Sequence, residues 1–313
     1  MKSTVSVEGR QPVWRKVSKD FKTNWGLLVM FLPILIYYGM FHYAPMYGLQ
    51  IAFKDYTMYE GIFKSPWIGL EHFRSFFKSI YFIRLVRNTF VISFLDIVLG
   101  FPVPIIFALL LNELRINPFK RAVQTISYMP HFISTVVVAG MIIDFCSRRG
   151  LINIILGFFG IEPIVFLTVP PWFPWVYVLS GVWQHFGWGS IVYLGALTAI
   201  DPQLYEAASI DGANLWHKLV HVTIAGILPT IMIMLILRMG QVFSVGSEKI
   251  LLLYNSATYE TADVISTYVY RRGLVDANYS FSAAVGIFNS VINFVMLLTF
   301  NRISRKVTEV GLF

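Results

Sequence analysis

Charged residues and cysteine are both scarce in this 313-residue chain. Only 13% of the residues are charged and 56% are hydrophobic, with a mean hydropathy of +0.65. A soluble globular domain is about one-quarter charged and about one-half apolar. The composition therefore excludes an ordinary water-soluble domain. Cys146 is the single cysteine, which excludes an intrachain disulfide and a cysteine metal cluster.

Motifs for catalysis and nucleotide binding are also missing. The sequence has no G-x-x-x-x-G-K-[ST] loop, no H-E-x-x-H and no G-x-S-x-G, the patterns that hold phosphates, a catalytic zinc and a serine nucleophile. His217 and His221 are four residues apart, but no third ligand is near them, so we expect no metal site. We therefore expect this chain neither to hydrolyse ATP nor to catalyse another reaction.

Long apolar stretches take the place of these motifs. They cover residues 26–44, 87–111, 123–145, 172–200, 222–243 and 281–300. Each is near the roughly 20 residues that a helix needs to cross a bilayer. The sequence predicts an all-α membrane protein with six transmembrane helices in residues 26–300, between tails at 1–25 and 301–313.

Two apolar segments, the first stretch and residues 151–159, differ from an ordinary membrane span in position or length. The first stretch is too long for a signal-peptide core and has no small-residue cleavage site after it, so we expect an uncleaved first span. Residues 151–159 are apolar but too few to cross. We expect this segment to lie at the membrane interface or to be partly re-entrant.

The net charge of +8 would suggest a nucleic-acid partner in a soluble protein. Here the basic residues flank the spans. With the amino terminus inside, the inner segments have 13 Lys and Arg in 70 residues and the outer segments have 10 in 105. The positive-inside rule therefore favours cytoplasmic termini, and we expect no nucleic acid as partner.

Prolines interrupt several predicted spans: Pro33, Pro102, Pro104 and Pro229. Each removes a backbone donor and kinks its helix, which a membrane protein tolerates where a neighbour or a water-filled cavity satisfies the freed carbonyl. Kinked helices around a cavity suit a transporter. Proline is also generally commoner in membrane helices than in soluble ones, and the residues alone leave both explanations open.

The segment 201–229, between the fourth and fifth spans, predicts two helices. Asp201 can accept hydrogen bonds from the first free amides, Pro202 suits the first helical position, and Gly212 can adopt the positive φ that ends a helix. We expect the first helix over residues 202–210. A second helix leads into the fifth span.

Small and acidic side chains meet on this first helix. Ala207 and Ala208 would let another protein approach closely, while Glu206 and Asp211 could orient it by their charge. Such a helix suits docking on the cytoplasmic face. An ordinary solvated loop helix would have a similar composition, so these residues alone leave both readings open.

The run EAASIDGAN at 206–214 resembles the EAA loop of type I ABC importer permeases, in the form found in carbohydrate-uptake permeases. The family pattern usually closes with Leu-Pro, whereas this chain has Ile224-Ala225 and a later Pro229. This departure leaves the hinge at the start of the fifth span open. Further stretches resemble the branch for complex oligosaccharides and polysaccharide fragments: YAPMYGLQIAFKD at 43–55, FPVPIIFALLLNE at 101–113, YMPHFIS at 128–134 and NRISR at 301–305.

This resemblance implies a function and a set of partners. The chain would be a permease subunit in a bacterial plasma membrane that takes up oligosaccharides by alternating access. It would assemble with a second, related permease, two ATPase subunits that bind ATP and magnesium, and an extracytoplasmic solute-binding protein. The implied coupling residues are Glu206, Ala207, Ala208, Asp211 and Gly212. An ion-coupled transporter, or a permease for another solute, is the alternative.

Five residues inside the spans are candidates for the substrate path. Asp96 and Arg238 lie at membrane depth, where ionisable groups usually face the bundle interior. They can pair, line the path or act as structural anchors. Trp183, Trp188 and Tyr193 in the fourth span offer aromatic faces that can stack on sugar rings. An aromatic belt at the membrane boundary is the alternative for such side chains, and it suits Trp172 and Trp175 at the outer edge of that span better.

Overall fold

The computed structural model describes residues 23–312, and this part of the chain is helical. Its only β-type pairing is an isolated bridge between Lys54 and Trp67. The all-α prediction is confirmed. The helices of eleven residues or more are α2 (Trp25–Tyr38), α6 (Phe82–Leu95), α7 (Pro102–Glu113), α8 (Asn117–Tyr128), α9 (Thr135–Phe145), α11 (Phe173–Thr198), α14 (Ala225–Met239) and α18 (Tyr279–Thr308).

Shorter helices connect these long ones. They are α3 (Ala44–Met46), α4 (Gly61–Lys64), α5 (Glu71–Lys78), α10 (Leu151–Gly157), α12 (Pro202–Ile210), α13 (Leu215–Lys218), α15 (Ser247–Leu253), α16 (Tyr259–Ala262) and α17 (Ile265–Tyr270). Turns of π-helix join α6 to α7 over Asp96–Gly100 and α13 to α14 over Leu219–Ile224. Each π turn lies a few residues before a proline, where the α-helical hydrogen-bond ladder is interrupted.

Four continuous helices in the described chain are long and apolar enough to cross a membrane: Trp25–Phe53, Phe82–Glu113, Leu215–Met239 and Tyr279–Thr308. They contain the predicted first, second and sixth spans, and they contain the predicted fifth span, 222–243, up to Met239, where the helix ends. The predicted fourth span corresponds to α11, which has 26 residues and no charged side chain. Polar groups such as Gln184 and His185 lower its hydropathy. The number of six spans therefore stays a prediction.

The predicted third span, 123–145, is not one continuous helix. Its residues fall in two helical segments, Asn117–Phe132 and Thr135–Phe145, that meet at an angle of 100°. Pro130 lacks the amide that a continuing helix needs. Ser134 has extended backbone and its hydroxyl accepts from the amide of Val137, so it caps a new helix. The two segments form a broken span or a re-entrant hairpin. The predicted interfacial segment 151–159 contains the short helix α10.

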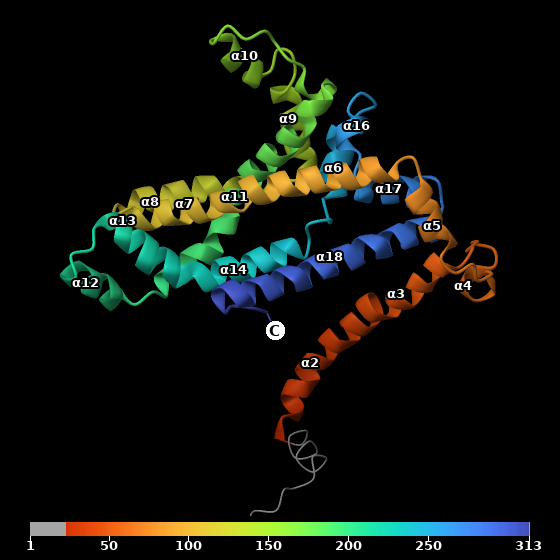
Figure 1. Ribbon diagram of the computed structural model, residues 1–313, viewed down its shortest axis with the longest axis horizontal. Helices are drawn as coiled ribbons and strands as arrows, with labels where there is room; N and C mark the ends of the chain where they lie inside the picture. The colour runs from red at the N-terminus through yellow and green to blue at the C-terminus, as the bar shows by residue number, and fades with distance from the viewer. Residues whose placement is uncertain (1–22, 313) are drawn as a thin grey trace, which may run out of the picture.

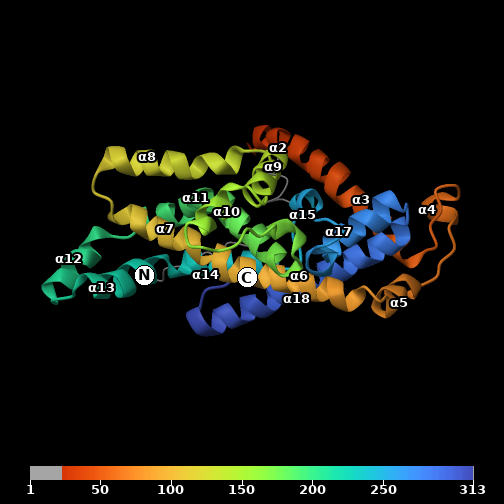
Figure 2. The ribbon, with the colours of Figure 1, turned by 90° about the horizontal axis from the view of Figure 1, so that it is seen from above.

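Helix α11 occupies the centre of the fold. It packs against α6, α7, α8 and α14, and α14 packs in turn against α18. In both views, α12 lies at one end of the molecule with the connection between α7 and α8, and α4 and α5 lie at the other end (Figures 1 and 2). Helix α2 extends away from the bundle (Figure 1) and has no buried residue.

Close packing of α11 against α8 requires glycine at position 187. A Cβ atom built there would overlap the backbone carbonyl of Ser127. The two helices therefore approach more closely than any other side chain permits. Gly195, two turns further along α11, has open space around it.

Gly187→Ala is expected to destabilise the protein by about 1–3 kcal/mol, because a methyl group must push two packed backbones apart. The midpoint of thermal unfolding in detergent measures this effect. Gly195→Ala is the matched control in the same helix, and it should leave the midpoint unchanged or raise it slightly. Equal midpoints for the two variants would contradict the close approach.

A fully buried carboxylate, Asp263, ties α6 to α17. Its Oδ2 accepts from Arg84 at 3.2 Å and from Arg271 at 2.8 Å, and its Oδ1 accepts from the hydroxyl of Thr267 at 2.9 Å. Asn88 donates to its backbone oxygen at 2.9 Å. Burial works against the charge of Arg271, but the hydrogen bond and charge of Asp263 outweigh this and raise the pKa of Arg271. The two helices are thus held by a paired and hydrogen-bonded charge.

Asp263→Ala should therefore cost about 3–5 kcal/mol of stability, since it leaves two partly buried guanidinium groups without their counter-charge. Asp276→Ala is the control, because Asp276 pairs with Arg272 at the surface, where such pairs contribute about 0–1 kcal/mol. Thermal unfolding in detergent separates the two cases. A similar loss from both variants would show that burial of Asp263 has no special weight.

Candidate functional site

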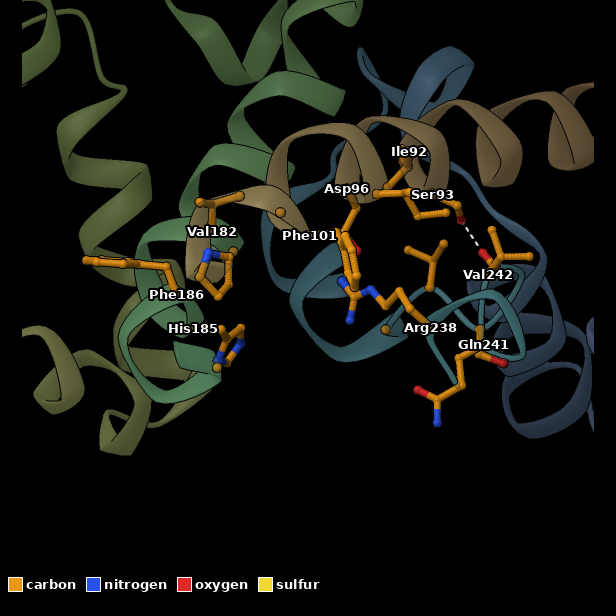
Figure 3. Close-up of a pocket in the computed structure, with 18 of the residues that line it drawn as sticks. Ile92, Ser93, Asp96, Phe101, Val182, His185, Phe186, Arg238, Gln241 and Val242 are labelled. Atoms are coloured by element: carbon orange, nitrogen blue, oxygen red, sulfur yellow. Dashed lines mark hydrogen bonds and ion pairs between the residues drawn. The ribbon is translucent and has the colours of Figure 1, made fainter. Parts of the chain in front are cut away.

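A cavity of about 380 Å³ lies between α6, α7, α11 and α14, with α15 at its border. Its volume is in the range of small-molecule sites. Its lining combines aromatic rings, such as Phe101 and Tyr177, with a few charged and polar groups. Figure 3 shows labelled lining residues around it, with Asp96 on one side and His185 on another.

Asp96 and Arg238 form an ion pair within this cavity. Asp96 begins the π turn after α6, where the widened helical turn changes the direction in which the side chain points. Arg238 lies in the last turn of α14, whose terminal carbonyls favour a cation. The sequence analysis left pairing open, and the structure shows it. Whether the pair contacts the substrate stays a prediction.

The three aromatic candidates lie in different surroundings. Tyr193 is buried and lines the cavity. Trp183 and Trp188 do not line it, and both are exposed on the surface of this chain. Trp188 stacks on His131, with ring centroids 4.8 Å apart. The substrate-path prediction thus joins Asp96, Tyr193 and Arg238 in one place and separates the two tryptophans from it.

Sequence reasoning did not select most of the cavity residues, among them Tyr177, His185, Gln241 and Lys249. Spacing along α11 could have identified Tyr177 and His185, since Tyr177 lies about four turns and His185 about two turns before Tyr193 on that helix. Gln241 lies near the end of the predicted fifth span, 222–243, and Lys249 belongs to the segment 244–280, which was assigned to an outer loop. Lys249 precedes an apolar run, which is a weak sign that its helix is buried. All four line the cavity.

The predicted first helix of the loop 201–229 is confirmed as α12, with the expected bounds Pro202–Ile210. The carboxylate of Asp201 accepts from the amide of Gln203 at 2.9 Å. Gly212 has φ +77°, and the amide of Ala213 donates to the carbonyl of Ala208 at 2.9 Å, which closes the helix end. The local signals read in the sequence act as expected.

Helix α12 is fastened to the helix that follows it. The hydroxyls of Tyr205 and Thr223 are 3.0 Å apart, and Lys218 donates to the hydroxyl of Ser209 at 2.7 Å. Asn214 caps α13 by accepting from the amide of His217 at 2.9 Å. These contacts join α12 to the start of the helix Leu215–Met239.

The predicted coupling residues lie on an accessible surface. Glu206, Ala207, Asp211 and Gly212 are exposed, and Ala208 is half-buried. Three apolar side chains that the sequence analysis did not select surround them: Ile210, Leu215 and Trp216, which are 87%, 83% and 68% exposed. These three side chains add apolar surface beside the predicted coupling residues, whose role stays a prediction.

The two histidines of α13 and its continuation take part in local contacts. His217 Nδ1 lies 2.8 Å from Asn214 Oδ1, and its ring stacks on that of His221. Residues 23–312 contain no group of three His, Cys, Asp or Glu side chains suited to a metal ion.

Comparison with known proteins identifies the family. Residues 100–309 match the model of the binding-protein-dependent transport system inner membrane component family. This chain belongs to that family. It is also 43% identical over 288 residues to the polygalacturonan/rhamnogalacturonan transport system permease protein YteP of Bacillus subtilis, covering 92% of this chain and 90% of YteP. Protein LplB of the same species is 40% identical over 310 residues, covering 99% of this chain and 96% of LplB.

Solved structures show the same fold. One chain in the crystal structure of a bacterial alginate ABC transporter, in complex with a periplasmic protein that holds an alginate pentasaccharide, superposes with a TM-score of 0.86. It is 44% identical, and the match covers 96% of this chain and all of that chain. A chain in a second structure, of a bacterial ABC transporter that imports alginate, superposes with a TM-score of 0.85. It is 46% identical, and the match covers 94% of this chain and 99% of that chain. The fold is that of type I ABC importer permeases, and the resemblance seen in the sequence is confirmed.

Removing one partner of the Asp96–Arg238 ion pair should destabilise the protein more than removing both partners. Asp96→Ala and Arg238→Met each leave one charge unpaired at membrane depth, so each should lower the midpoint of thermal unfolding. The double variant leaves no unpaired charge, and it should recover part of the loss.

Solute uptake by the same variants tests the second role of the pair. If the pair lines the substrate path, the double variant should fold and yet take up solute more slowly. If both single variants unfolded at the wild-type midpoint, the ion pair would not contribute to the stability of the protein.

Proposed function

We propose that this chain is the membrane-spanning permease subunit of an ABC importer for oligosaccharides or polysaccharide fragments. One observation supports it above all. Helix α12 is exposed at one end of the molecule and is joined by two side-chain hydrogen bonds to the helix Leu215–Met239. The far end of that helix carries Arg238 into the cavity. One continuous helix therefore joins α12 to the cavity.

In this proposal, Glu206, Ala207, Ala208, Asp211 and Gly212 couple the permease to an ATPase subunit. The small side chains admit the partner closely, and the two carboxylates orient it. Ile210, Leu215 and Trp216 add the apolar contact that usually supplies most of the affinity. ATP and magnesium bind to the partner, since this sequence has no phosphate-binding loop.

Transport then follows from movement between two states. Closure of two ATPase subunits on ATP displaces α12, and the helices around the cavity open it alternately to the two sides of the membrane. The π turns before Pro102 and Pro229 are positions where these helices bend with little cost, because their hydrogen-bond ladders are already interrupted.

The family assignment and the basic flanks also support the proposed partners and the membrane location of this chain. The family is described as binding-protein-dependent, which supports an extracytoplasmic solute-binding protein that delivers the saccharide. A second, related permease completes the pathway, because four or five apolar spans enclose only a small cavity. The chain would lie in a bacterial plasma membrane with its termini in the cytoplasm, as its basic flanks indicate.

An ion-coupled transporter is less well supported. Such proteins use carboxylates at membrane depth to bind the driving ion. Asp96 is the carboxylate that lines this cavity, and Arg238 already neutralises it.

The coupling assignment is tested by exchanging Glu206 for Arg. The reversed charge should lower saccharide-stimulated ATP hydrolysis of the assembled transporter by roughly tenfold or more, because contacts at the centre of an interface contribute about 2 kcal/mol. Co-purification of the ATPase subunits through a tag on this chain measures assembly in the same preparation.

Glu113→Arg is the matched control, since Glu113 is an exposed acid that ends α7 near the same end of the molecule. Its hydrolysis and assembly should equal those of the wild type. Normal coupling and assembly in the Glu206 variant would sink the proposed role of α12.

A further inference from the structure

Lys249 is a buried cation in the wall of the cavity. Only 9% of the residue is exposed, although it belongs to a segment that looks like a loop in the sequence. Its Nζ donates to the backbone carbonyl of Tyr177 at 3.1 Å and lies over the ring of Tyr177, 5.1 Å from the centroid. An ammonium group has three donors, and one of them is used in this way.

No carboxylate within the described residues pairs with Lys249. The ion pairs of residues 23–312 involve Asp96, Asp263, Asp276 and Glu71, and in each the partner is an arginine. Asp96 is the acid nearest in the cavity, and Arg238 occupies it. The neighbouring Glu248 is exposed. The cavity lining thus includes one acid, Asp96, and two basic side chains, Arg238 and Lys249.

An unpaired cation in such a place is costly to the fold. Lys and Arg are rarely buried unless they are paired, and at membrane depth their cost is higher still. Hydrogen bonding to a carbonyl and contact with an aromatic face offset part of the cost. The remainder is compensated if an anion enters the cavity, because a charge-assisted hydrogen bond then forms in a region of low dielectric constant.

The chemistry of the lining limits what this anion is. Tyr177, Tyr193 and Phe101 supply aromatic faces, and Gln241 supplies an amide, which suits a sugar ring with hydroxyl groups. The single free ammonium suits a carboxylate, because lysine binds an anion as a point charge. A uronic acid combines the two features.

We propose that Lys249 recognises the carboxylate of a uronate residue during transport, so that the imported saccharide is acidic. This inference rests on the proposed function and narrows its substrate class. The comparisons agree with it, since YteP is named for polygalacturonan and the two solved transporters for alginate, which the second structure describes as an acidic polysaccharide.

The test uses the complete transporter in proteoliposomes, with its binding protein and ATPase subunits. Initial rates of uptake are measured for oligogalacturonate, for alginate oligosaccharide and for the carboxyl-reduced, neutral form of each. Lys249→Gln should lower uptake of the acidic forms by about tenfold, as expected for one lost charge-assisted hydrogen bond, and leave the neutral forms unchanged. Lys249→Arg should retain most of the acidic uptake.

Lys54→Gln is the matched control. Lys54 is also 9% exposed, donates to the carbonyl of Ile62 at 2.7 Å and lies over the ring of Trp67, but it is outside the cavity. Its variant should transport acidic and neutral forms alike. If Lys249→Gln lowered uptake of the acidic and neutral forms equally, Lys249 would have a structural role or would pair with a carboxylate of another subunit. The inference would then be wrong.

A chemical rescue separates charge from shape. Cys146 is the single cysteine and is buried, so Lys249→Cys in a Cys146→Ala background places one addressable thiol in this chain. A methanethiosulfonate that adds an aminoethyl group should restore acidic uptake, and one that adds a sulfonatoethyl group should not. Transporter with Lys249 in place, treated identically, controls for other subunits.

The two levels of the proposal fail differently. A wild-type transporter that imports none of the four saccharides contradicts the proposed function. One that imports only the neutral forms, or that imports acidic forms equally well with Gln at position 249, leaves the importer function intact and overturns the inference on Lys249.

Discussion

Asp263 sets the constraint from which much of this fold follows. Its side chain has no exposed surface, and two guanidinium groups and a hydroxyl surround it. A carboxylate in such a place is stable only while these partners are in position. The requirement fixes Arg84 on α6 against Arg271, just after α17, and so fixes how the segment 244–280 folds back onto the bundle. Through that segment it also places α15 and Lys249 at the cavity.

The same electrostatic rule applies at the cavity, with a different outcome. Asp96 and Arg238 satisfy each other across α6 and α14, whereas Lys249 has only a carbonyl and a ring. Arg238 pairs with the acid of the cavity, and Lys249 has no acid within the described residues, so its charge is available to a ligand that enters the cavity. The helix Leu215–Met239 joins this cavity to α12 at the surface, where an ATPase would act in the proposed function.

Predictability along the chain depended on the range of the interactions. Helix α12 was predicted to the residue because Asp201, Pro202 and Gly212 act on backbone groups within a few positions of themselves. The break near Pro130 was missed because hydropathy averages over about 20 residues and does not register one missing amide. The tryptophans were misleading for another reason. Depth in a span can be counted from the sequence, but the face on which Trp183 and Trp188 lie depends on how α11 is rotated against its neighbours.

The sequence by itself therefore determined the membrane class, the all-helical fold, the family and the surface helix α12, because apolar length, capping and a local motif are properties of short segments. Only the tertiary structure decided that Asp96 pairs with Arg238, 142 positions away in the sequence. It also decided that Lys249, in a segment predicted to be a loop, lines the cavity. Contacts of this kind form between distant segments, and their geometry is set by helix packing and by the pairing of buried charges. No local pattern in the chain encodes either of these.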